Sequence, residues 1–269
     1  MTHRIFISSY RKDFKWLEYF LKSCKKFCRG FHDRPVVAVP EEDLSLAAHL
    51  GELAHFVRRP DVLGRGMMSS QRAMLEADRY CPGTDFVHLL GSDNFVAEPY
   101  VAEDFLRDGR PLMYRIPYSH WKESAPIDHC HPTNWQKGIR LVFHTDAEFE
   151  YMNRKPNLYP RPLYELTRMM IEEHMPGVSW WDYVQHAEKT LFSEQNVLGF
   201  VAERWAPHLY HFVPNTNYKG SAFETAYIDQ KQPILAFWSW GGLDRPICAG
   251  TTGETPRQVI ERILGEKVT

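Results

Sequence analysis

The sequence predicts an α/β fold of the Rossmann-like kind, with a mostly parallel central sheet flanked by helices. Short apolar runs bounded by polar residues are typical of buried strands, and apolar residues that recur at three- and four-residue steps are typical of amphipathic helices. Over residues 4–90 these segments follow one another as strand, helix, strand, strand, helix and strand. That order is characteristic of parallel sheets with helices packed on their faces.

The first half contains four predicted strands and two predicted helices. The strands are RIFISS (4–9), PVVAV (35–39), LAHFV (53–57) and DFVHLL (85–90). A helix is predicted from Asp13 to Cys28, because its apolar residues lie three or four positions apart and lysines fill much of the rest. A second helix is predicted over 68–80, since Pro82 and Gly83 follow it and stop helices.

The second half, from residue 116, is less regular. It contains a Trp- and His-rich loop (118–135), predicted helices over 162–173 and 192–203, and an aromatic strand over 234–240. Repeats, low-complexity segments and long linkers are lacking from the sequence, so we expect a single domain over 1–269 with two unequal halves, 1–115 and 116–269.

Composition narrows the class of protein. Of 269 residues, 43% are hydrophobic and 14% aromatic, which is enough for a substantial core. The net charge of −2 argues against nucleic-acid binding by bulk charge. Five cysteines, an odd number without a CxxC pair, are expected to be free thiols in a reducing compartment. Without an apolar run of ~20 residues, we expect a soluble cytoplasmic protein of a bacterium, or of a cell infected by a phage.

The stretch HLLGSDNFVAEPY (88–100) joins a predicted strand to an acidic turn. Ligands of open α/β sheets bind at the carboxyl ends of the strands. Carboxylate oxygens there hold a hard cation such as Mg²⁺ or Mn²⁺, which in turn bridges to a pyrophosphate. Asp93 is the candidate ligand, with Ser92 and Asn94 as supporting polar groups. The alternative is an Asx turn, in which Asp93 only caps backbone amides.

Several stretches, taken in order, resemble the GT-A glycosyltransferases, in particular a poorly characterised group from bacteria and phages. They cover well over half of the chain. The stretches are SYRKDFKWLEYFLKSCKKF, VVAVPEEDL, SSQRAMLEADRY with HLLGSDNFVAEPY, EFEYMNRKPNLYPRPLYELTRMMIEEHMPGVSWWDYV and FSEQNVLGFV.

The resemblance implies a GT-A-like fold, with a nucleotide-sugar-binding half and a less regular acceptor-side half. It implies a glycosyltransferase, either a hexosyl- or a pentosyltransferase, that takes a sugar from a nucleotide-diphosphate sugar, with a UDP-sugar as the first expectation. Ser9, Tyr10 and Asp13 match the loop that receives the base and ribose; Tyr10 could instead pack at a strand end. Gln71 and Arg72 would approach the sugar or the phosphates, unless Arg72 is a solvated helix residue.

One position departs from the family pattern. The family has Asp-Ser-Asp, whereas this chain has Gly91 in the first place. Asp93 would then need help to hold Mn²⁺ or Mg²⁺, and the resemblance points to a late histidine. His208 and His211 are the last two histidines, and their spacing could place both on one helical face. His211 is the metal candidate; the alternative is an ordinary hydrogen-bonded histidine.

Glu194 matches the family's Ser-Glu position near the acceptor. A carboxylate there can act as general base toward the acceptor hydroxyl, or position the acceptor if the reaction retains configuration. The alternative is structural: Ser193 would be the N-cap of a helix, and Glu194 would interact with the helix dipole.

Two other groups of residues carry weaker signals. The histidines and cysteine at 120, 129, 130 and 131 lack the spacing of a zinc site and are expected to form a cleft loop or plain surface. The abundant tryptophans suit stacking on sugars or bases as well as core packing. They are Trp121, Trp135, Trp180, Trp181, Trp238 and Trp240.

The acceptor stays open at this stage. A bacterial surface glycan is the first candidate, and a flipped hydroxymethylated DNA base, as in phage DNA modification, is the second. A nucleotide-sugar hydrolase, or an inactive nucleotide-sugar-binding protein, would explain the loss of the acidic residue at position 91.

Overall fold

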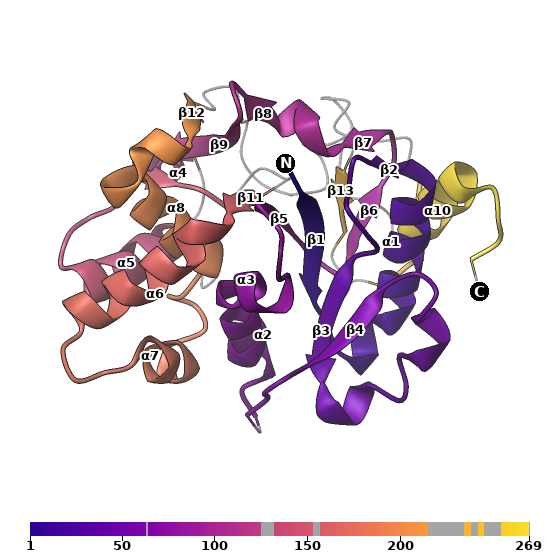
Figure 1. Ribbon diagram of the computed structural model, residues 1–269, viewed down its shortest axis with the longest axis horizontal. Helices are drawn as coiled ribbons and strands as arrows, with labels where there is room; N and C mark the ends of the chain where they lie inside the picture. The colour runs from indigo at the N-terminus through magenta and orange to yellow at the C-terminus, as the bar shows by residue number, and fades with distance from the viewer. Residues whose placement is uncertain are drawn as a thin grey trace.

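The computed structural model describes residues 1–62, 64–124, 132–152, 157–214, 234–237, 242–244 and 254–268. Its centre is a five-stranded sheet with the order β11-β5-β1-β3-β4 (Figure 1). Four of these strands are parallel, and β11 runs antiparallel to β5. The strands are β1 (His3–Ser8), β3 (Val36–Pro40), β4 (His55–Arg59), β5 (Phe86–Leu90) and β11 (Asn157–Pro160). The predicted mostly parallel sheet is therefore confirmed.

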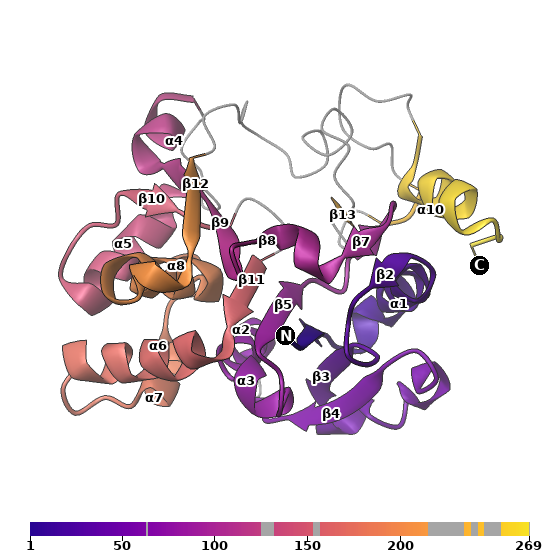
Figure 2. The same cartoon turned by 45° about the horizontal axis from the view of Figure 1, so that its top comes forward.

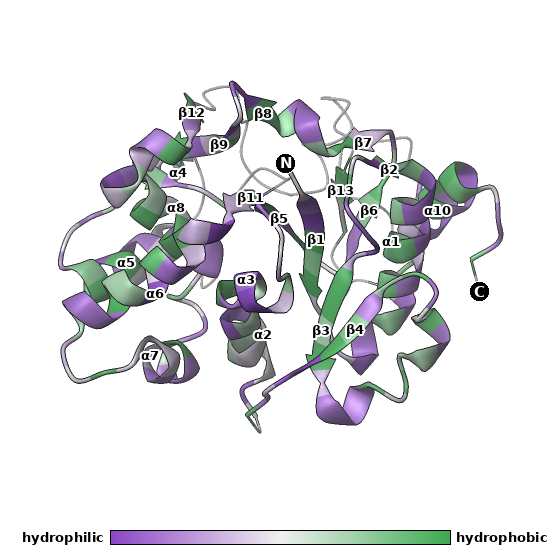
Figure 3. Cartoon of the chain, in the orientation of Figure 1, coloured by the Kyte–Doolittle hydropathy of each residue, from purple (hydrophilic) through white to green (hydrophobic). Residues whose placement is uncertain are grey.

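Helices cover both faces of this sheet, because side chains alternate between the faces along each strand. Ile5 and Ile7 pack with α1 (Phe14–Phe27) in one core cluster. Phe6, between them, belongs to the other cluster, which includes residues of α2 (Gly66–Leu75), α6 (Arg161–His174) and α8 (Glu194–Trp205). In Figure 3 β3 is mostly hydrophobic and β1 is hydrophobic in its later part, whereas α5 and α6 each show both hydrophobic and hydrophilic residues.

A second, smaller sheet lies beside the first, where β11 and β9 are in contact. In it β9 (Arg110–Pro117) pairs in parallel with β12 (His211–Pro214) and antiparallel with β10 (Phe149–Glu150) and β8 (Leu106–Arg107) (Figure 2). The remaining elements are η1 (Arg11–Asp13), β2 (Cys28–Arg29), η2 (Glu41–Asp43), η3 (Ala48–Leu50), α3 (Ala77–Tyr80), β6 (Asn94–Val96), β7 (Tyr100–Val101), η4 (Ala102–Phe105), α4 (Tyr118–Ser124), α5 (Thr133–Phe143), α7 (Trp180–His186), η5 (Pro207–Leu209), β13 (Ile234–Ala236) and α10 (Pro256–Leu264).

Most predicted elements are present at nearly the predicted positions, with two differences. The predicted helix over 68–80 is split at Glu76 into α2 and α3. The predicted loop over 118–135 is wrong in part, because it contains α4 and the start of α5. Tyr118 and Trp121, three residues apart, are buried on one side of α4, a helical spacing that its polar neighbours obscured. Residues 238–240 of the predicted last strand lie outside the described residues.

Two other expectations concern the chain as a whole. Cys24, Cys28 and Cys81 are free thiols, as predicted, while Cys130 and Cys248 lie outside the described residues. No helix in the described ranges has both the length and the apolar character of a membrane span. Both halves contribute to the central sheet, since β11 joins β5.

A buried polar chain crosses the core on the α1 face of the sheet. Nδ1 of His3 lies 3.0 Å from Nε2 of His88, and Nδ1 of His88 lies 2.5 Å from the Tyr100 hydroxyl. His88 and Tyr100 are fully buried. Burial lowers the pKa of His3 and lowers that of His88 well below its usual value. The folded protein therefore resists protonation of both rings.

This histidine pair predicts how stability depends on pH. Since the unfolded chain takes up protons on these histidines near pH ~6.5 and the folded chain does not, the free energy of unfolding should decrease as the pH falls from about 7 to about 5. His88→Asn should make that decrease smaller in urea titrations across this pH range. Exposed His49→Asn is the control, and an unchanged pH dependence in His88→Asn would contradict the prediction.

Candidate functional site

The strand register brings the predicted site segments to one edge of the central sheet. Ile7 of β1 pairs with Leu90 of β5, so the loops that follow these two strands begin side by side. On the other side of β5, Asn157 at the start of β11 pairs with Leu89. The carboxyl end of β5 therefore lies between the loop after β1 and the beginning of β11.

The acidic stretch after β5 forms a tight turn closed by Asn94. Asn94 N donates to the Gly91 carbonyl at 3.1 Å, and Gly91 N donates to Asn94 Oδ1 at 2.8 Å. The turn-forming side chain is thus that of Asn94, and Asp93 stays partly exposed. Phe95 and Val96 then enter the core, where β6 pairs with β13. Asp93 therefore lies at the carboxyl edge of the sheet, and the buried residues Phe95 and Val96 anchor the turn to the core.

Gly91 leaves room for the Asp93 carboxylate. A Cβ at position 91 would lie 2.8 Å from Asp93 Oδ1 and 3.4 Å from Asn94 Nδ2. Real Cβ atoms essentially never come that close, so any side chain at this position would displace the carboxylate. Glycine at position 91, which departs from the family pattern, therefore allows the observed conformation of Asp93.

The loop after β1 touches the loop after β5. Ser92 Oγ donates to Asp13 Oδ2 at 3.3 Å, which joins two residues that were predicted to bind the nucleotide. Ser9 is buried, and its hydroxyl has no hydrogen-bond partner among the described residues. Tyr10 is 42% exposed, so packing at the strand end does not explain it. Partial burial, with a smaller contribution from Asp13, raises the pKa of the Tyr10 phenol.

Arg72 on α2 is buried, which excludes the solvated alternative. Its Cζ lies 4.2 Å from the centre of the Trp181 ring on α7, and its Nε lies 3.5 Å from Glu76 Oε2. Burial lowers the pKa of this guanidinium. Nε and Nη1 of Arg72 have no hydrogen-bond partner among the described residues. Gln71, its neighbour, is partly exposed.

The N-terminus of α8 carries four buried polar residues, Ser193 to Asn196. Ser193 is the N-cap, as predicted: its Oγ accepts from Asn196 N at 3.3 Å. Glu194 is the first helical residue and is only 4% exposed. Asn157 Nδ2 donates to Gln195 Oε1, and this hydrogen bond fastens α8 to β11. Glu194 is thereby placed near the carboxyl end of β5.

A second carboxylate supports this helix end. Glu150 is fully buried, and its Oε1 accepts from Met152 N at 2.6 Å and from Asn196 Nδ2 at 3.4 Å. Burial raises the pKa of the Tyr159 phenol far above its usual value, and the carboxylates of Glu194 and Glu150 raise it further. Glu150, Asn157 and Gln195 were not predicted as site residues, although all three lie within or beside the stretches that carry the resemblance.

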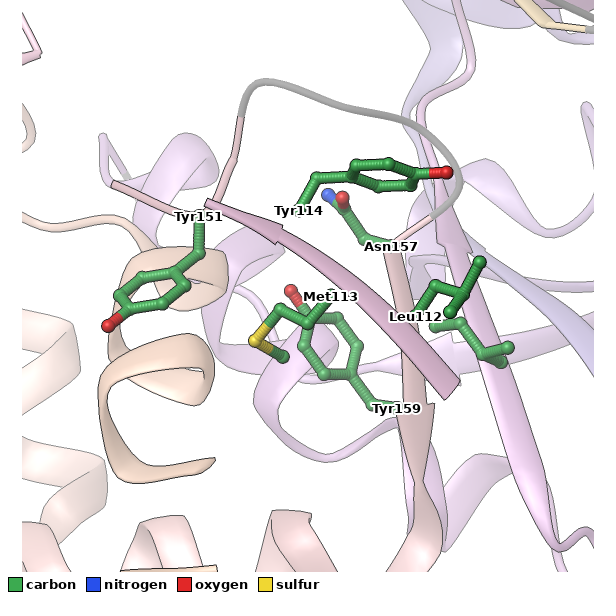
Figure 4. A pocket seen from close by; sticks show the side chains of 7 residues that line it. Leu112, Met113, Tyr114, Tyr151, Asn157 and Tyr159 are labelled. Carbon is green, nitrogen blue, oxygen red and sulfur yellow. The ribbon is translucent and has the colours of Figure 1, made fainter. Parts of the chain in front are cut away.

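A small pocket opens beside this polar group, between β9 and β11 (Figure 4). It is lined by Leu112, Met113, Tyr114, Tyr151, Asn157, Leu158 and Tyr159. Asn157, the partner of Gln195, is therefore also accessible from the pocket. Tyr151 packs against Gly199 of α8, where a Cβ would overlap its ring.

The predicted histidines lie elsewhere. His208 is in η5 and His211 begins β12, so the expectation that they share a helical face is wrong. His211 Nε2 lies 3.6 Å from Asp108 Oδ2, and its Nδ1 lies 3.5 Å from Arg110 Nη2. Over the described ranges, no three His, Cys, Asp or Glu side chains are grouped as metal ligands. His129, Cys130 and His131 lie outside those ranges; His120 is on α4.

The tryptophans divide between core and partly exposed positions. Trp121 and Trp180 are buried, at 4% and 8% exposure, so core packing accounts for them. Trp135 and Trp181 are partly exposed. Trp238 and Trp240 lie outside the described residues.

One comparison with known proteins supports the fold. No protein-family model and no curated protein matches the sequence. Among solved structures, the chain is similar to the apo structure of the bifunctional glycosyltransferase WbbM, with a TM-score of 0.57 and 12% identity. That match covers 99% of this chain and 50% of the WbbM chain, so this chain spans half the length of that protein. The likeness confirms the predicted GT-A-like fold.

The galactosyltransferase LgtC, solved in complex with donor and acceptor sugar analogues, is also similar. Its TM-score is 0.49 at 14% identity, over 99% of this chain and 96% of that chain. This TM-score is too low to support an inference.

The contact of Tyr151 with Gly199 predicts a strong effect of a small substitution. Gly199→Ala should lower the free energy of unfolding by about 1–3 kcal/mol, because the added methyl group has no space against the Tyr151 ring. Urea denaturation measures this. Gly66→Ala is the control, since a Cβ there meets nothing within 4 Å. Equal stabilities of the two variants would contradict the close packing.

Proposed function

We propose that this protein is a glycosyltransferase that moves a sugar from a nucleotide-diphosphate sugar, with UDP-sugars as the first candidates, to the hydroxyl of an acceptor. The fold supports the proposal, since it is shared with a glycosyltransferase of known structure. Fold alone does not define an activity. The proposal therefore depends on the residues at the carboxyl edge of the sheet.

The observation that carries the proposal is the convergence of two kinds of polar group at the end of β5. Asp13 and Ser92 are in contact at the loops that follow β1 and β5, and we assign them to the donor side. Gln195, next to Glu194, is bonded to Asn157, which pairs with Leu89 of β5, and we assign Glu194 to the acceptor side. A transferase needs this pairing, because it must hold a donor and deprotonate an acceptor next to it.

Each side has a defined role in the proposal. Tyr10 and Asp13 bind the nucleoside, where an exposed ring can stack on the base and a carboxylate can accept from ribose hydroxyls. Glu194 takes the proton from the acceptor hydroxyl. Ser193 and the turn of α8 hold the Glu194 backbone, and Gln195 is held by Asn157.

The residues at the edge fit a divalent cation only in part. Asp93 offers one partly exposed carboxylate, and Gly91 offers none. A bound Mn²⁺ or Mg²⁺ would stabilise negative charge on the departing diphosphate, and Asp93 is its proposed ligand. We do not assign His211 to this role, because its two ring nitrogens already face Arg110 Nη2 at 3.5 Å and Asp108 Oδ2 at 3.6 Å.

Nucleotide binding is the direct test. The thermal midpoint should rise with UDP or a UDP-sugar, measured with and without Mn²⁺, because a ligand at 100 times its dissociation constant adds ~2.7 kcal/mol of stability. GDP and GDP-sugars serve as comparison ligands. If none of these compounds shifts the midpoint, the proposed function is wrong.

The two sides of the site should separate in mutants. Glu194→Gln should abolish sugar transfer and leave nucleotide affinity nearly unchanged, while Asp93→Asn should weaken donor binding first. Donor consumption and calorimetric affinity measure the two effects. The matched control is exposed Glu173→Gln on α6. Unchanged turnover in Glu194→Gln would remove Glu194 from the mechanism, and release of free sugar by the wild type without an acceptor would identify a hydrolase.

A further inference from the structure

Arg59, the last residue of β4, carries a buried positive charge that is only partly compensated. Its side chain is 2% exposed, and its Nε has no hydrogen-bond partner among the described residues. The carboxylate nearest to it in an ion pair is that of Asp61, 3.8 Å from Nη2. Asp43, also in its vicinity, is held by Arg11 through N at 2.8 Å and Nε at 2.6 Å.

The remaining contact of Arg59 is with a hydroxyl at the carboxyl end of β1. Arg59 Nη1 donates to Ser8 Oγ. Because a guanidinium can only donate, Ser8 Oγ is the acceptor in this bond, and its own hydrogen is left to be given elsewhere. Among the described residues none accepts a hydrogen bond from Ser8, and the residue is partly exposed. Ser8 is thus an accessible hydrogen-bond donor whose hydroxyl is held in place by the buried guanidinium of Arg59.

The register of the sheet locates this donor beside the acidic turn. Ile7 pairs with Leu90, so Ser8 is next in line to Gly91, one strand spacing of about 4.8 Å away. Side chains alternate, so Ser8 lies on the same face as Phe6, the face covered by α2. Arg59 lies on that face too, because Val57, two residues before it, packs in the same cluster. Ser8 is therefore adjacent to the position where the family pattern has a carboxylate and this chain has Gly91, and Arg59 reaches Ser8 from β4, on the side away from β5.

We propose that Ser8 and Arg59 form an oxyanion site at the carboxyl end of β1, which binds a phosphate group of the nucleotide donor directly. The inference rests on the proposed function, since it assigns a ligand within that donor site. Ser8 donates its hydrogen to a phosphate oxygen. Arg59, buried behind Ser8, orients the Ser8 hydroxyl and partly compensates the phosphate charge. The affinity that Ser8 and Arg59 add for the phosphate does not depend on a divalent cation.

Physical chemistry favours an anion here over a neutral ligand. Arginine stays protonated at neutral pH even where burial lowers its pKa, as it does for Arg59. A buried charge with incomplete pairing is costly to the folded protein. A phosphate group supplies both the missing negative charge and a hydrogen-bond acceptor for Ser8.

Isothermal titration calorimetry with uridine, UDP and inorganic pyrophosphate tests the site, in EDTA and again in Mn²⁺. Arg59→Gln should weaken UDP and pyrophosphate by about 10- to 100-fold in both buffers and leave uridine unchanged, as expected for loss of a charged hydrogen-bonding group. Ser8→Ala should weaken the same two ligands to a smaller extent. Arg58→Gln is the matched control, because Arg58 is exposed, adjacent in sequence and paired with Glu41 at 3.1 Å.

The outcomes separate this inference from the proposed function. Equal UDP affinity in wild type, Arg59→Gln and Ser8→Ala would overturn the oxyanion site while leaving the transferase proposal intact. An equal loss of uridine affinity would also overturn it, because the pair would then recognise the nucleoside. Failure of the wild type to bind any of the three ligands would overturn both. Circular dichroism checks folding, and if Arg59→Gln is unfolded, Ser8→Ala decides alone.

Discussion

The pairing of β5 with β1 on one side and with β11 on the other is the constraint on which the site depends. Each pair is held by backbone hydrogen bonds whose register is fixed by the buried side chains on both faces. A shift of β1 by one residue would turn Phe6 to the α1 face and Ile5 and Ile7 to the α2 face, so the packing of both core clusters would be lost. The same register sets which polar residues emerge together at the carboxyl edge. The same strand register therefore determines both the packing of the core and the positions of the residues at the carboxyl edge.

Buried polar groups orient the N-terminus of α8 relative to the strands that the register aligns. At the N-terminus of α8, Asn196 bonds to Glu150 of β10 and to Tyr151 N, and Gln195 accepts from Asn157 of β11, while Ser193 caps the helix itself. Each of these groups would cost free energy if it were buried without a partner. Because the bonds are directional, they orient the first turn of the helix far more narrowly than apolar contacts could. These hydrogen bonds fix the orientation of the helix end that carries Glu194.

Much of the fold could be predicted from the sequence, because it depends on local patterns. The four parallel strands, α1, α6 and α8 follow apolar periodicity, and the cap at Ser193 follows from its residue type. The pattern failed at α4, where Tyr118 and Trp121 are the only signal in a polar, His-rich stretch. The break at Glu76 also gave no signal in the spacing of the apolar residues.

The site was predictable only where its residues belong to a motif. Asp93, Asp13 and Glu194 stand in the resembling stretches, and the structure brings their segments to one edge. Arg59 lies outside these stretches and Glu150 lies within one, but nothing in their sequence neighbourhoods marks either residue as buried. Only the fold removes them from water and assigns their partners. His211 shows the reverse case: a residue type suited to a metal, placed by β12 beside a guanidinium.

The buried charges near the sheet edge differ in how completely they are paired. Glu150 accepts hydrogen bonds from Met152 N and Asn196 Nδ2. Arg72 is paired with the buried carboxylate of Glu76, whereas the ion pair of Arg59, to Asp61, spans 3.8 Å. Transfer of a sugar from a diphosphate creates negative charge on the leaving group and releases a proton from the acceptor. A site for this reaction needs cations around the first and a carboxylate near the second, separated by the sugar. Under the proposed function, the incompletely paired charge of Arg59 would serve the leaving diphosphate and Glu194 would serve the acceptor. A carboxylate at position 91, next to Ser8, would bring negative charge to the side where the proposal requires positive charge.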